Sequence, residues 1–170
     1  VLWCLYHARR FDEALAMARE RLQIEPGNIM LLYGTSYLLS AIGRHAEAIE
    51  AARKSIEIMG KASHTLGRLA TAHAKAGDVA RAEALLSEMQ ELSSRRYISP
   101  YHLALVNAAL GRIEPALDSL EQTVEAKDSW VLWSAVDPEL DNLHGHPRFD
   151  NLLRKLNHRL AALPTLPIES

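Results

Sequence analysis

The junction Ala41-Ile42-Gly43-Arg44 returns further along the chain as Lys75-Ala76-Gly77-Asp78, and at the same interval again as Ala109-Leu110-Gly111-Arg112. Each junction separates an apolar stretch from a stretch that begins with charged residues. Glycine adopts the left-handed backbone at a helix end without a steric penalty from Cβ. The three evenly spaced glycines therefore predict a tight turn between two helices, repeated with a constant period.

Two columns of small residues keep the same period. An alanine follows each anchor position by five residues, and the column extends one unit further towards the N-terminus: Ala14, Ala48, Ala82 and Ala116. A second column precedes each glycine by seven residues: Ser36, Ala70 and Ala104. Small side chains let two helices approach closely, while larger apolar residues fill the space between neighbouring pairs. The period therefore predicts stacked helical hairpins.

This pattern resembles the tetratricopeptide repeat (TPR) family. The W-x2-L-G-x2-Y element of that family corresponds to Leu32-x2-Thr35-Ser36-x2-Leu39 and, in the next unit, to Leu66-x2-Leu69-Ala70-x2-His73. Its A-x3-F element corresponds to Ala48-x3-Ala52 and Ala82-x3-Leu86. The resemblance implies an all-α, right-handed superhelical solenoid of antiparallel helix hairpins with a C-terminal capping helix.

The period and its interruption set the expected organisation. We expect TPR repeats over residues 1–128, followed by short helices and a capping helix over 129–161 and a loose tail over 162–170. The full periods are 29–62, 63–96 and 97–130, and residues 1–28 form a truncated first repeat. Because the chain opens at Val1 without a methionine, we expect it to be part of a longer protein.

Helix starts are marked by side chains that accept hydrogen bonds from free backbone amides. They predict helices over about 29–42 and 64–76, one that begins near Pro100 and a last one over about 147–161. The expected capping residues are Asn28, Ser63, Asp78, Ser99, Asp137 and His146. His73 and Asn107 share one column, which predicts a buried polar pair between stacked units.

The residues after the last repeat carry a second resemblance. The residues Val136-Asp137-Pro138 and His146-Pro147-Arg148-Phe149 are similar to the end of TPR regions in bacterial signalling proteins. In those proteins the region follows a winged-helix, cyclase or kinase domain. The resemblance implies a bacterial, multidomain regulatory protein, and the lone cysteine, Cys4, fits a reducing, cytoplasmic location.

Composition argues against several classes of function. The formal net charge is -2, whereas nucleic acids and anionic membranes are bound by dense basic surfaces. The sequence contains no glycine-rich phosphate loop, no G-x-S-x-G and no H-E-x-x-H. Cys4 is expected to face the packing, and His144, His146 and His158 lack the pattern of a structural metal site. We expect no catalytic residue, no metal and no cofactor.

In a TPR stack the first helix of each hairpin lines the concave groove. Residues three, four and seven apart share a helical face. The predicted groove residues are Met30, Tyr33, Tyr37, His64, Arg68, Thr71, Lys75, Tyr101, His102 and Leu105. The first helices contain no Asp or Glu, which favours a partner with carboxylates and an apolar anchor. The alternative is that these helices, flanked on both sides, carry few charges of either sign.

Some TPR proteins hold a C-terminal carboxylate with a clamp of Lys, Asn and Arg. The corresponding places here offer His64 and Arg68 but otherwise Trp3, Met30, Gly34 and Ile98, so chaperone-tail binding is not expected. The leading hypothesis is a protein-interaction scaffold that binds a peptide or a partner domain. The alternative is an oligomerisation or ligand-sensing domain that controls an attached effector. Trp130 and Trp133 then form the edge of a homodimer, or else they pack against the terminal helix.

Overall fold

The computed structural model describes residues 1–161, with side chains up to residue 157. The expected tail, 162–170, lies outside the described residues. Within them the chain forms helices and turns and no strand. The elements in chain order are α1 (Leu2–His7), α2 (Phe11–Ile24), α3 (Ile29–Ala41), α4 (His45–Met59), α5 (Ser63–Lys75), α6 (Val79–Ser93), α7 (Pro100–Ala109), α8 (Ile113–Glu125), η1 (Ser129–Trp133), η2 (Pro138–Leu143) and α9 (Pro147–Ala161).

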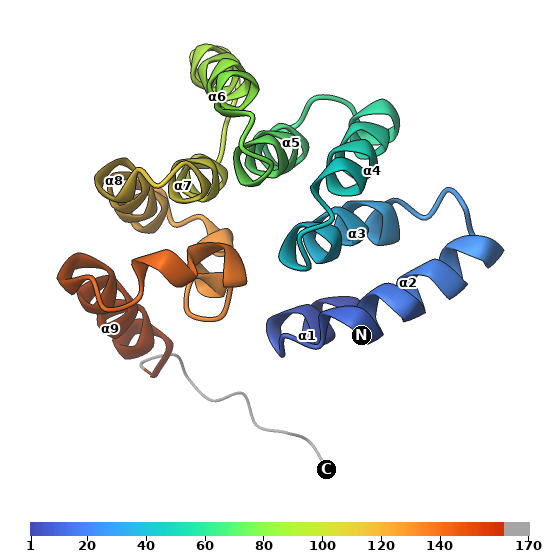
Figure 1. Ribbon diagram of the computed structural model, residues 1–170. Helices are drawn as coiled ribbons and strands as arrows, with labels where there is room; N and C mark the ends of the chain where they lie inside the picture. Colours follow the sequence, from blue (N-terminus) through green and yellow to red (C-terminus); the bar gives the residue numbers. More distant parts are fainter. Residues whose placement is uncertain (162–170) are drawn as a thin grey trace.

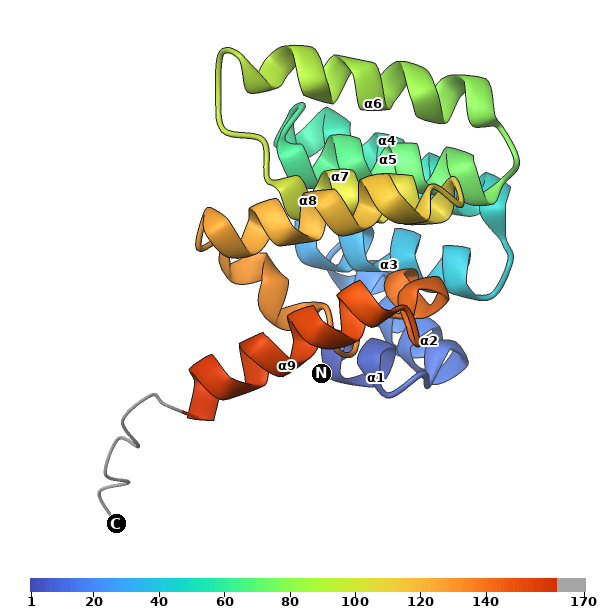
Figure 2. The same cartoon turned by 90° about the vertical axis from the view of Figure 1, so that its left-hand side faces the viewer.

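The hairpins are arranged in an arc with two layers. Helices α3, α5 and α7 form the inner row, and their partners α4, α6 and α8 form the outer row (Figure 1). Figure 2 shows that the helices of each pair run antiparallel along one another. The all-α, TPR-type solenoid expected from the repeated junctions is confirmed. None of the helices in residues 1–161 has both the length and the apolar character that crossing a bilayer requires.

The predicted turns depend on left-handed glycines. Gly43, Gly77 and Gly111 have φ values of 77°, 80° and 72°. The first hairpin makes the same turn at Arg9, with a φ of 60°. Only glycine adopts this conformation without a steric cost, so the anchor glycines follow from the geometry of the turn.

The small columns lie where two helices of a hairpin meet. Ala48, Ala82 and Ala116 are fully buried. Ser36 is buried as well, and its Oγ donates a hydrogen bond of 2.8 Å to the carbonyl of Ala48 in the facing helix. A larger side chain in this column would push the two helices apart.

Most of the expected capping residues act as caps. The side chains of Asn28, Asp78 and Asp137 accept backbone hydrogen bonds, and Nδ1 of His146 accepts one from the amide of Arg148. Ser99 stands at the N-cap position of α7, but its side chain makes no capping hydrogen bond.

The expectation for Ser63 was wrong. It lies inside α5, whose first turn is closed by Thr65, because the Thr65 hydroxyl accepts from the amide of Ala62 at 2.9 Å. The hydroxyl of Ser63 instead accepts from the amide of Ser99 at 3.0 Å, across to the next hairpin.

Two further expectations need correction. His73 Nδ1 lies 3.1 Å from Asp78 Oδ2, and Asn107 donates to the carbonyl of Leu103, so each is satisfied within its own hairpin rather than by the other. Cys4, expected to face the packing, is exposed, because α1 buries Leu2 and Tyr6 instead.

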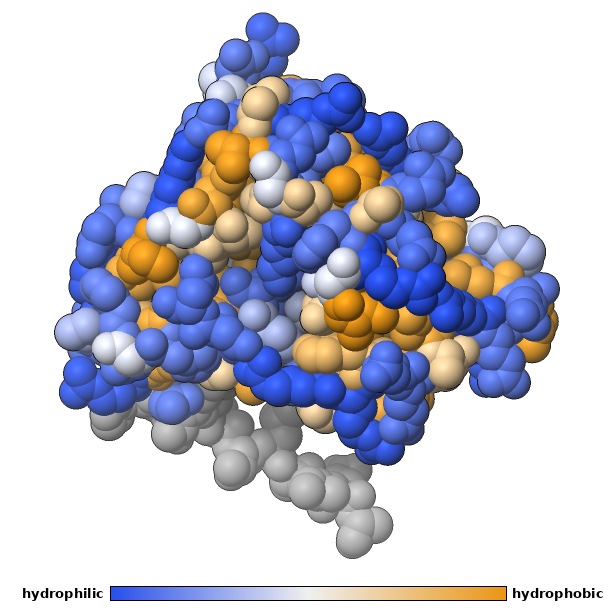
Figure 3. All heavy atoms as spheres, viewed as in Figure 1, coloured by the Kyte–Doolittle hydropathy of each residue, from blue (hydrophilic) through white to orange (hydrophobic). Residues whose placement is uncertain are grey.

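The C-terminal helix covers the last hairpin, as a capping helix must in a solenoid. Phe149, Leu152 and Leu156 on α9 are buried in one cluster with Leu117 and Leu120 of α8. On the face shown in Figure 3, hydrophobic residues form separate patches between hydrophilic ones. That face therefore presents no continuous apolar surface.

Candidate functional site

Residues 129–143, which contain η1 and η2, turn back into the concave side of the arc; we call them the closing segment. In Figure 1 this segment lies between α7 and α1. Tyr6 of α1 donates a hydrogen bond of 3.4 Å to Asp137 Oδ1 of the closing segment. The two ends of the described solenoid are therefore joined through the groove.

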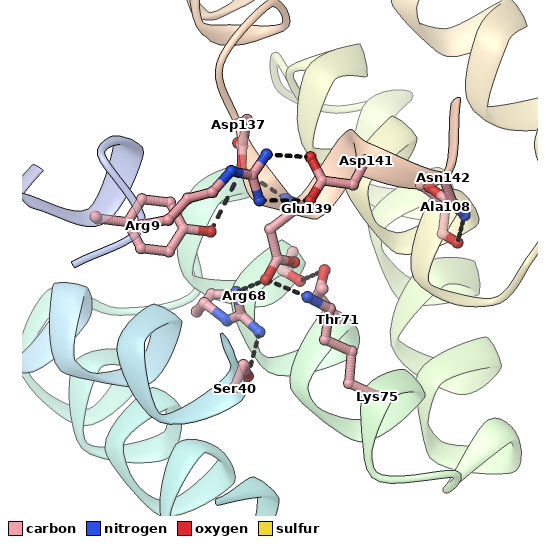
Figure 4. Close-up of polar contacts among 12 residues, drawn as sticks. Arg9, Ser40, Arg68, Thr71, Lys75, Ala108, Asp137, Glu139, Asp141 and Asn142 are labelled. Atoms are coloured by element: carbon pink, nitrogen blue, oxygen red, sulfur yellow. Dashed lines mark hydrogen bonds and ion pairs between the residues drawn. The ribbon is translucent and has the colours of Figure 1, made fainter. Parts of the chain in front are cut away.

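Glu139 is the centre of the polar contacts inside the groove (Figure 4). Its Oε1 accepts a hydrogen bond of 2.8 Å from Lys75 and lies 3.1 Å from Nη1 of Arg68. Arg68 also donates to the hydroxyl of Ser40 at 2.9 Å. Burial by itself raises the pKa of Glu139, but the positive charges of Arg68 and Lys75 outweigh burial and lower the pKa to about 2. The ionised form of Glu139 is thus strongly favoured in the folded state.

Asp137 is the second buried carboxylate of the closing segment. Its Oδ2 accepts from the hydroxyl of Tyr101 at 2.7 Å, and its Oδ1 accepts from the amide of Glu139 at 2.9 Å. Burial, followed by the charge of Glu139, raises the pKa of Asp137 above its ordinary value. At the surface of the same segment, Asp141 forms two hydrogen bonds of 2.6 Å with the guanidinium of Arg9.

An aromatic pocket of about 140 Å³ opens where the closing segment meets α1 and α3. It is lined by Trp3, Tyr6, His7, Met30, Tyr33, Tyr37, Tyr101, Trp130, Trp133 and Asp137. The four tyrosines and Asp137 are buried and form its floor. Met30, Trp130 and Trp133 are 55%, 37% and 42% exposed and belong to its rim. All three tryptophans of the chain therefore gather at one opening.

Ring contacts hold the two sides of this pocket. The ring of Trp3 lies 5.3 Å from that of Tyr37 at an angle of 77°, and 6.0 Å from that of Tyr33. Across the pocket, His7 of α1 stacks on Trp133 of η1, with ring centroids 4.8 Å apart. The rim thus combines residues from both ends of the solenoid, and it exists only when the closing segment is in place.

The residues predicted for the groove do gather on one side of the arc, where the chain itself covers most of them. Met30, Tyr33, Tyr37 and Tyr101 line the aromatic pocket. Arg68 and Lys75 contact Glu139 instead of lining an open groove.

The remaining predicted groove residues lie outside the pocket. Thr71 donates to the carbonyl of Gly67, and Leu105 is buried in the core of the last hairpin. His102 is buried beside Ser63, and half-buried His64 lies against Tyr33 with ring centroids 5.4 Å apart.

Tyr6, His7 and Asp137 were not anticipated as lining residues, and Trp3 was named only as the residue at a clamp position. The spacing of Trp3, Tyr6 and His7 places three rings on one face of a helix, a signal that is readable in the sequence. Nothing local to Asp137 indicates that it meets this face. The sequence suggested that Trp130 and Trp133 form an edge separate from the groove, whereas they line the same pocket as the groove tyrosines.

A metal centre has no support in the described residues, which contain no group of three potential ligands. His146 caps α9, and its Nε2 lies 3.4 Å from Glu114. The side chain of His158 lies outside the described residues.

Comparison with known proteins finds a distant relative over most of the chain. The chain is 27% identical over 165 residues to an Hsp70-Hsp90 organizing protein from Triticum aestivum. The match covers 94% of this chain but 28% of that protein, so the chain spans less than a third of the relative's length. This relative comes from a plant and lends no support to the bacterial context implied by the closing residues. No protein-family model and no solved structure matches the chain.

Proposed function

We propose that this chain is a protein-interaction module, in which a segment of a partner protein inserts a side chain into the aromatic pocket. One observation carries the proposal: Trp3, near the start of the chain, lines one pocket on the concave side of the repeats together with Trp130 and Trp133. Helical-repeat solenoids offer such concave surfaces to extended segments of other proteins.

The exposed rings favour binding energetically. Trp130 and Trp133 keep 37% and 42% of their surface in contact with water, so a partner that covers them gains hydrophobic free energy. Tryptophan and tyrosine dominate the binding energy of interfaces when they are held rigidly and surrounded by neutral contacts. Here the stack of His7 on Trp133 and the buried tyrosines beneath supply that rigidity.

The chemistry of the partner follows from the charges of the groove. Arg68 and Lys75 suggested a partner with carboxylates, but both contact Glu139 and neither lines the pocket. The proposal therefore keeps the apolar anchor and does not rest on these two cations. Since Arg68 is buried against Glu139, a carboxylate clamp has no free arginine at this position.

The relative supports a protein partner in general terms. Its name describes a protein that organises Hsp70 and Hsp90, and it matches this chain over most of the repeats. We carry over only the class of function, binding of proteins, and propose no catalytic role. The proposed setting, a bacterial signalling protein with an attached effector, rests on the resemblance of residues 136–149, and the proposed cytoplasmic location rests on the lone Cys4.

A peptide-display selection tests the proposal. Random peptides selected on the wild-type chain are expected to lose at least tenfold in affinity on Trp130→Ala, because hot-spot aromatic residues typically contribute about 2 kcal/mol or more. Val79→Ala is the control, since Val79 is an apolar residue that is 49% exposed on outer helix α6. Peptides that bind the Trp130→Ala variant as tightly as the wild type would refute this site.

The second candidate function is self-association through the same rim, favoured by the exposed Trp130 and Trp133. Light scattering across a concentration series separates the two. A monomer at every concentration supports the open pocket. A dimer that Trp130→Ala and Trp133→Ala each dissolve, but Val79→Ala does not, shows that a second copy is the partner.

A further inference from the structure

We propose that the aromatic pocket recognises a methylated ammonium group, carried as a trimethylated lysine on the partner. This inference rests on the proposed function, because the lysine enters on the same partner segment. It adds the charge and the chemical class of the group that the pocket receives.

The first argument is the arrangement of the rings. Faces of Trp and Tyr rings carry partial negative charge and attract cations, and cages of such rings are known recognition sites for quaternary ammonium groups. Around this pocket the rings are steeply inclined to one another: Tyr37 makes angles of 77° with Trp3, 78° with Tyr6 and 71° with Tyr33. These rings pack on Tyr37 in several orientations, so the lining is not one flat slot.

The second argument is the buried carboxylate. Asp137 is the acidic residue among the lining residues, and 5% of its surface is exposed. A charge in such a low-dielectric setting acts strongly on a neighbouring ion. The competing cation is Arg68, whose guanidinium lies 4.3 Å from the centre of the Tyr37 ring. Arg68 is paired with Glu139 and does not line the pocket, so the lining itself favours a positive guest.

The third argument separates a methylated ammonium from an ordinary lysine. Tyr33 bonds Tyr37 at 2.8 Å while Tyr6 and Tyr101 donate to Asp137, so these hydroxyls already have partners within the protein. A primary ammonium brings three N–H donors and is strongly hydrated, so its transfer from water to this largely aromatic lining costs more than that of a group without N–H. A trimethylammonium group has no N–H and needs only ring faces and a nearby negative charge.

The size of the pocket agrees with this guest. Its volume is about 140 Å³, and a cavity of about 150 Å³ in another protein holds benzene. A trimethylammonium head, with four heavy atoms, fits within this space. The exposed rim of Met30, Trp130 and Trp133 leaves an entrance for the lysine stem.

The experiment measures binding of small probes by tryptophan fluorescence, since every tryptophan of the chain lines the pocket. The probes are N-acetyl trimethyl-lysine methyl amide, its neutral isostere with carbon in place of nitrogen, the unmodified lysine derivative and tetramethylammonium. The trimethyl-lysine derivative is expected to saturate the signal at a concentration at least tenfold below that of the isostere or the unmodified lysine. Equal binding of the neutral isostere would overturn the cation proposal. If tetramethylammonium binds more tightly than the trimethyl-lysine derivative, the methylated ammonium group is not carried by a lysine.

Variants test which side chains of the pocket bind the trimethyl-lysine derivative. Asp137→Asn is expected to weaken the trimethyl-lysine derivative at least tenfold and to leave the isostere unchanged. Asp141→Asn is the matched control, because Asp141 is an exposed carboxylate of the same segment that pairs with Arg9 outside the pocket. If Asp137→Asn does not fold, the comparison of Trp130→Leu with Trp130→Phe decides, since only the phenylalanine keeps a ring face. If both substitutions weaken binding of the trimethyl-lysine derivative equally, the face of the Trp130 ring does not bind the cation, and the proposal fails.

The outcome is separable from that of the proposed function. Display-selected peptides that need Trp130 while the trimethyl-lysine derivative fails to bind would remove this inference alone. Failure of both the peptides and the probes would remove the pocket as a binding site altogether.

Discussion

The repeats and the closing segment are stabilised in different ways. In the repeats, the same kind of side chain returns at a constant interval, and a buried alanine meets its neighbour in each hairpin. In the closing segment every contact is individual: Glu139 reaches back 64 residues to Lys75, and Asp137 reaches back 131 residues to Tyr6. Contacts between neighbouring helices thus stabilise the repeats, whereas the pocket depends on a few polar contacts between residues far apart in the sequence.

The two regions should therefore respond differently to substitution. Apolar packing loses stability in proportion to the volume removed, and neighbouring side chains partly compensate. A buried ion pair is sensitive to the loss of one partner, because the remaining charge stays buried without compensation.

Glu139→Ala is expected to destabilise the fold by about 3–5 kcal/mol, because it leaves the buried guanidinium of Arg68 without its carboxylate. Urea unfolding followed by circular dichroism measures the loss. Glu47→Ala is the control, since Glu47 forms an exposed ion pair with Arg44. The double variant Arg68→Met/Glu139→Leu should recover most of the stability. A loss below about 1 kcal/mol in Glu139→Ala would show that the closing segment is not tied through this pair.

Acid should weaken the molecule in two stages. The pKa of Glu139 is about 2 in the folded state against 4.5 ordinarily, so its contribution is complete above pH 4.5 and is lost as pH falls towards 2. This shift corresponds to about 3 kcal/mol. Burial, then the nearby His64, lowers the pKa of His102 to about 3 from 6.5, so stability already declines below pH 6.5. The raised pKa of Asp137 has the opposite effect, because this carboxylate takes up a proton more readily in the folded state than in the unfolded state. It therefore offsets part of both declines in stability.

The control for the acid prediction is the double variant Arg68→Met/Glu139→Leu, measured by unfolding at a series of pH values. It should keep the decline that begins below pH 6.5 and lose most of the decline below pH 4.5. If the decline in stability below pH 4.5 is unchanged in this variant, it is caused by carboxylates other than Glu139.

Two glycines of the inner helices make a sharper test of packing. A Cβ on Gly67 would lie 2.9 Å from Cβ of His102, close to the backbone of α7, so Gly67→Ala is expected to cost about 1–3 kcal/mol. A Cβ on Gly34 would meet the flexible end of Leu2 at 2.6 Å, and the helical preference of alanine offsets part of the strain. The difference between the two melting temperatures tests this contrast, and equal losses would contradict it.

The smallest effect is expected at the surface of the closing segment. Arg9→Ala or Asp141→Ala removes an ion pair whose side chains are 52% and 45% exposed, so each should cost about 0.2–1 kcal/mol. A double-mutant cycle at low and high salt measures the coupling. A coupling that exceeds the effect of Glu139→Ala would reverse the order proposed for the two contacts.

The repeats were largely predictable because their signals are local. Gly43, Gly77 and Gly111 indicated turns whose φ values the structure confirms. Asn28 and Asp78 marked helix starts, and the helices predicted over 29–42 and 64–76 lie within one residue of α3 and α5. Ser63 misled because its hydroxyl serves the neighbouring hairpin, a contact that depends on how the hairpins stack.

The candidate site was predictable only in part. Tyr33, Tyr37 and Tyr101 were placed on the concave side by helical spacing, and they line the pocket. Trp130 and Trp133 are recognisable in the sequence as an apolar pair, but the pattern assigned them to a different surface. Their position depends on where the closing segment goes, and the repeat period ends before that segment begins.

The sequence by itself determined the hairpins, their period and the absence of acids from the inner helices, because turn geometry and helical spacing act within a few residues. Only the tertiary structure decided that Glu139 pairs with Arg68 and Lys75, and that Asp137 joins the tyrosines beneath three tryptophans. Those contacts link residues 36 to 131 positions apart. Local preferences do not encode such pairings, because they form only when the solenoid curves enough to bring its two ends together.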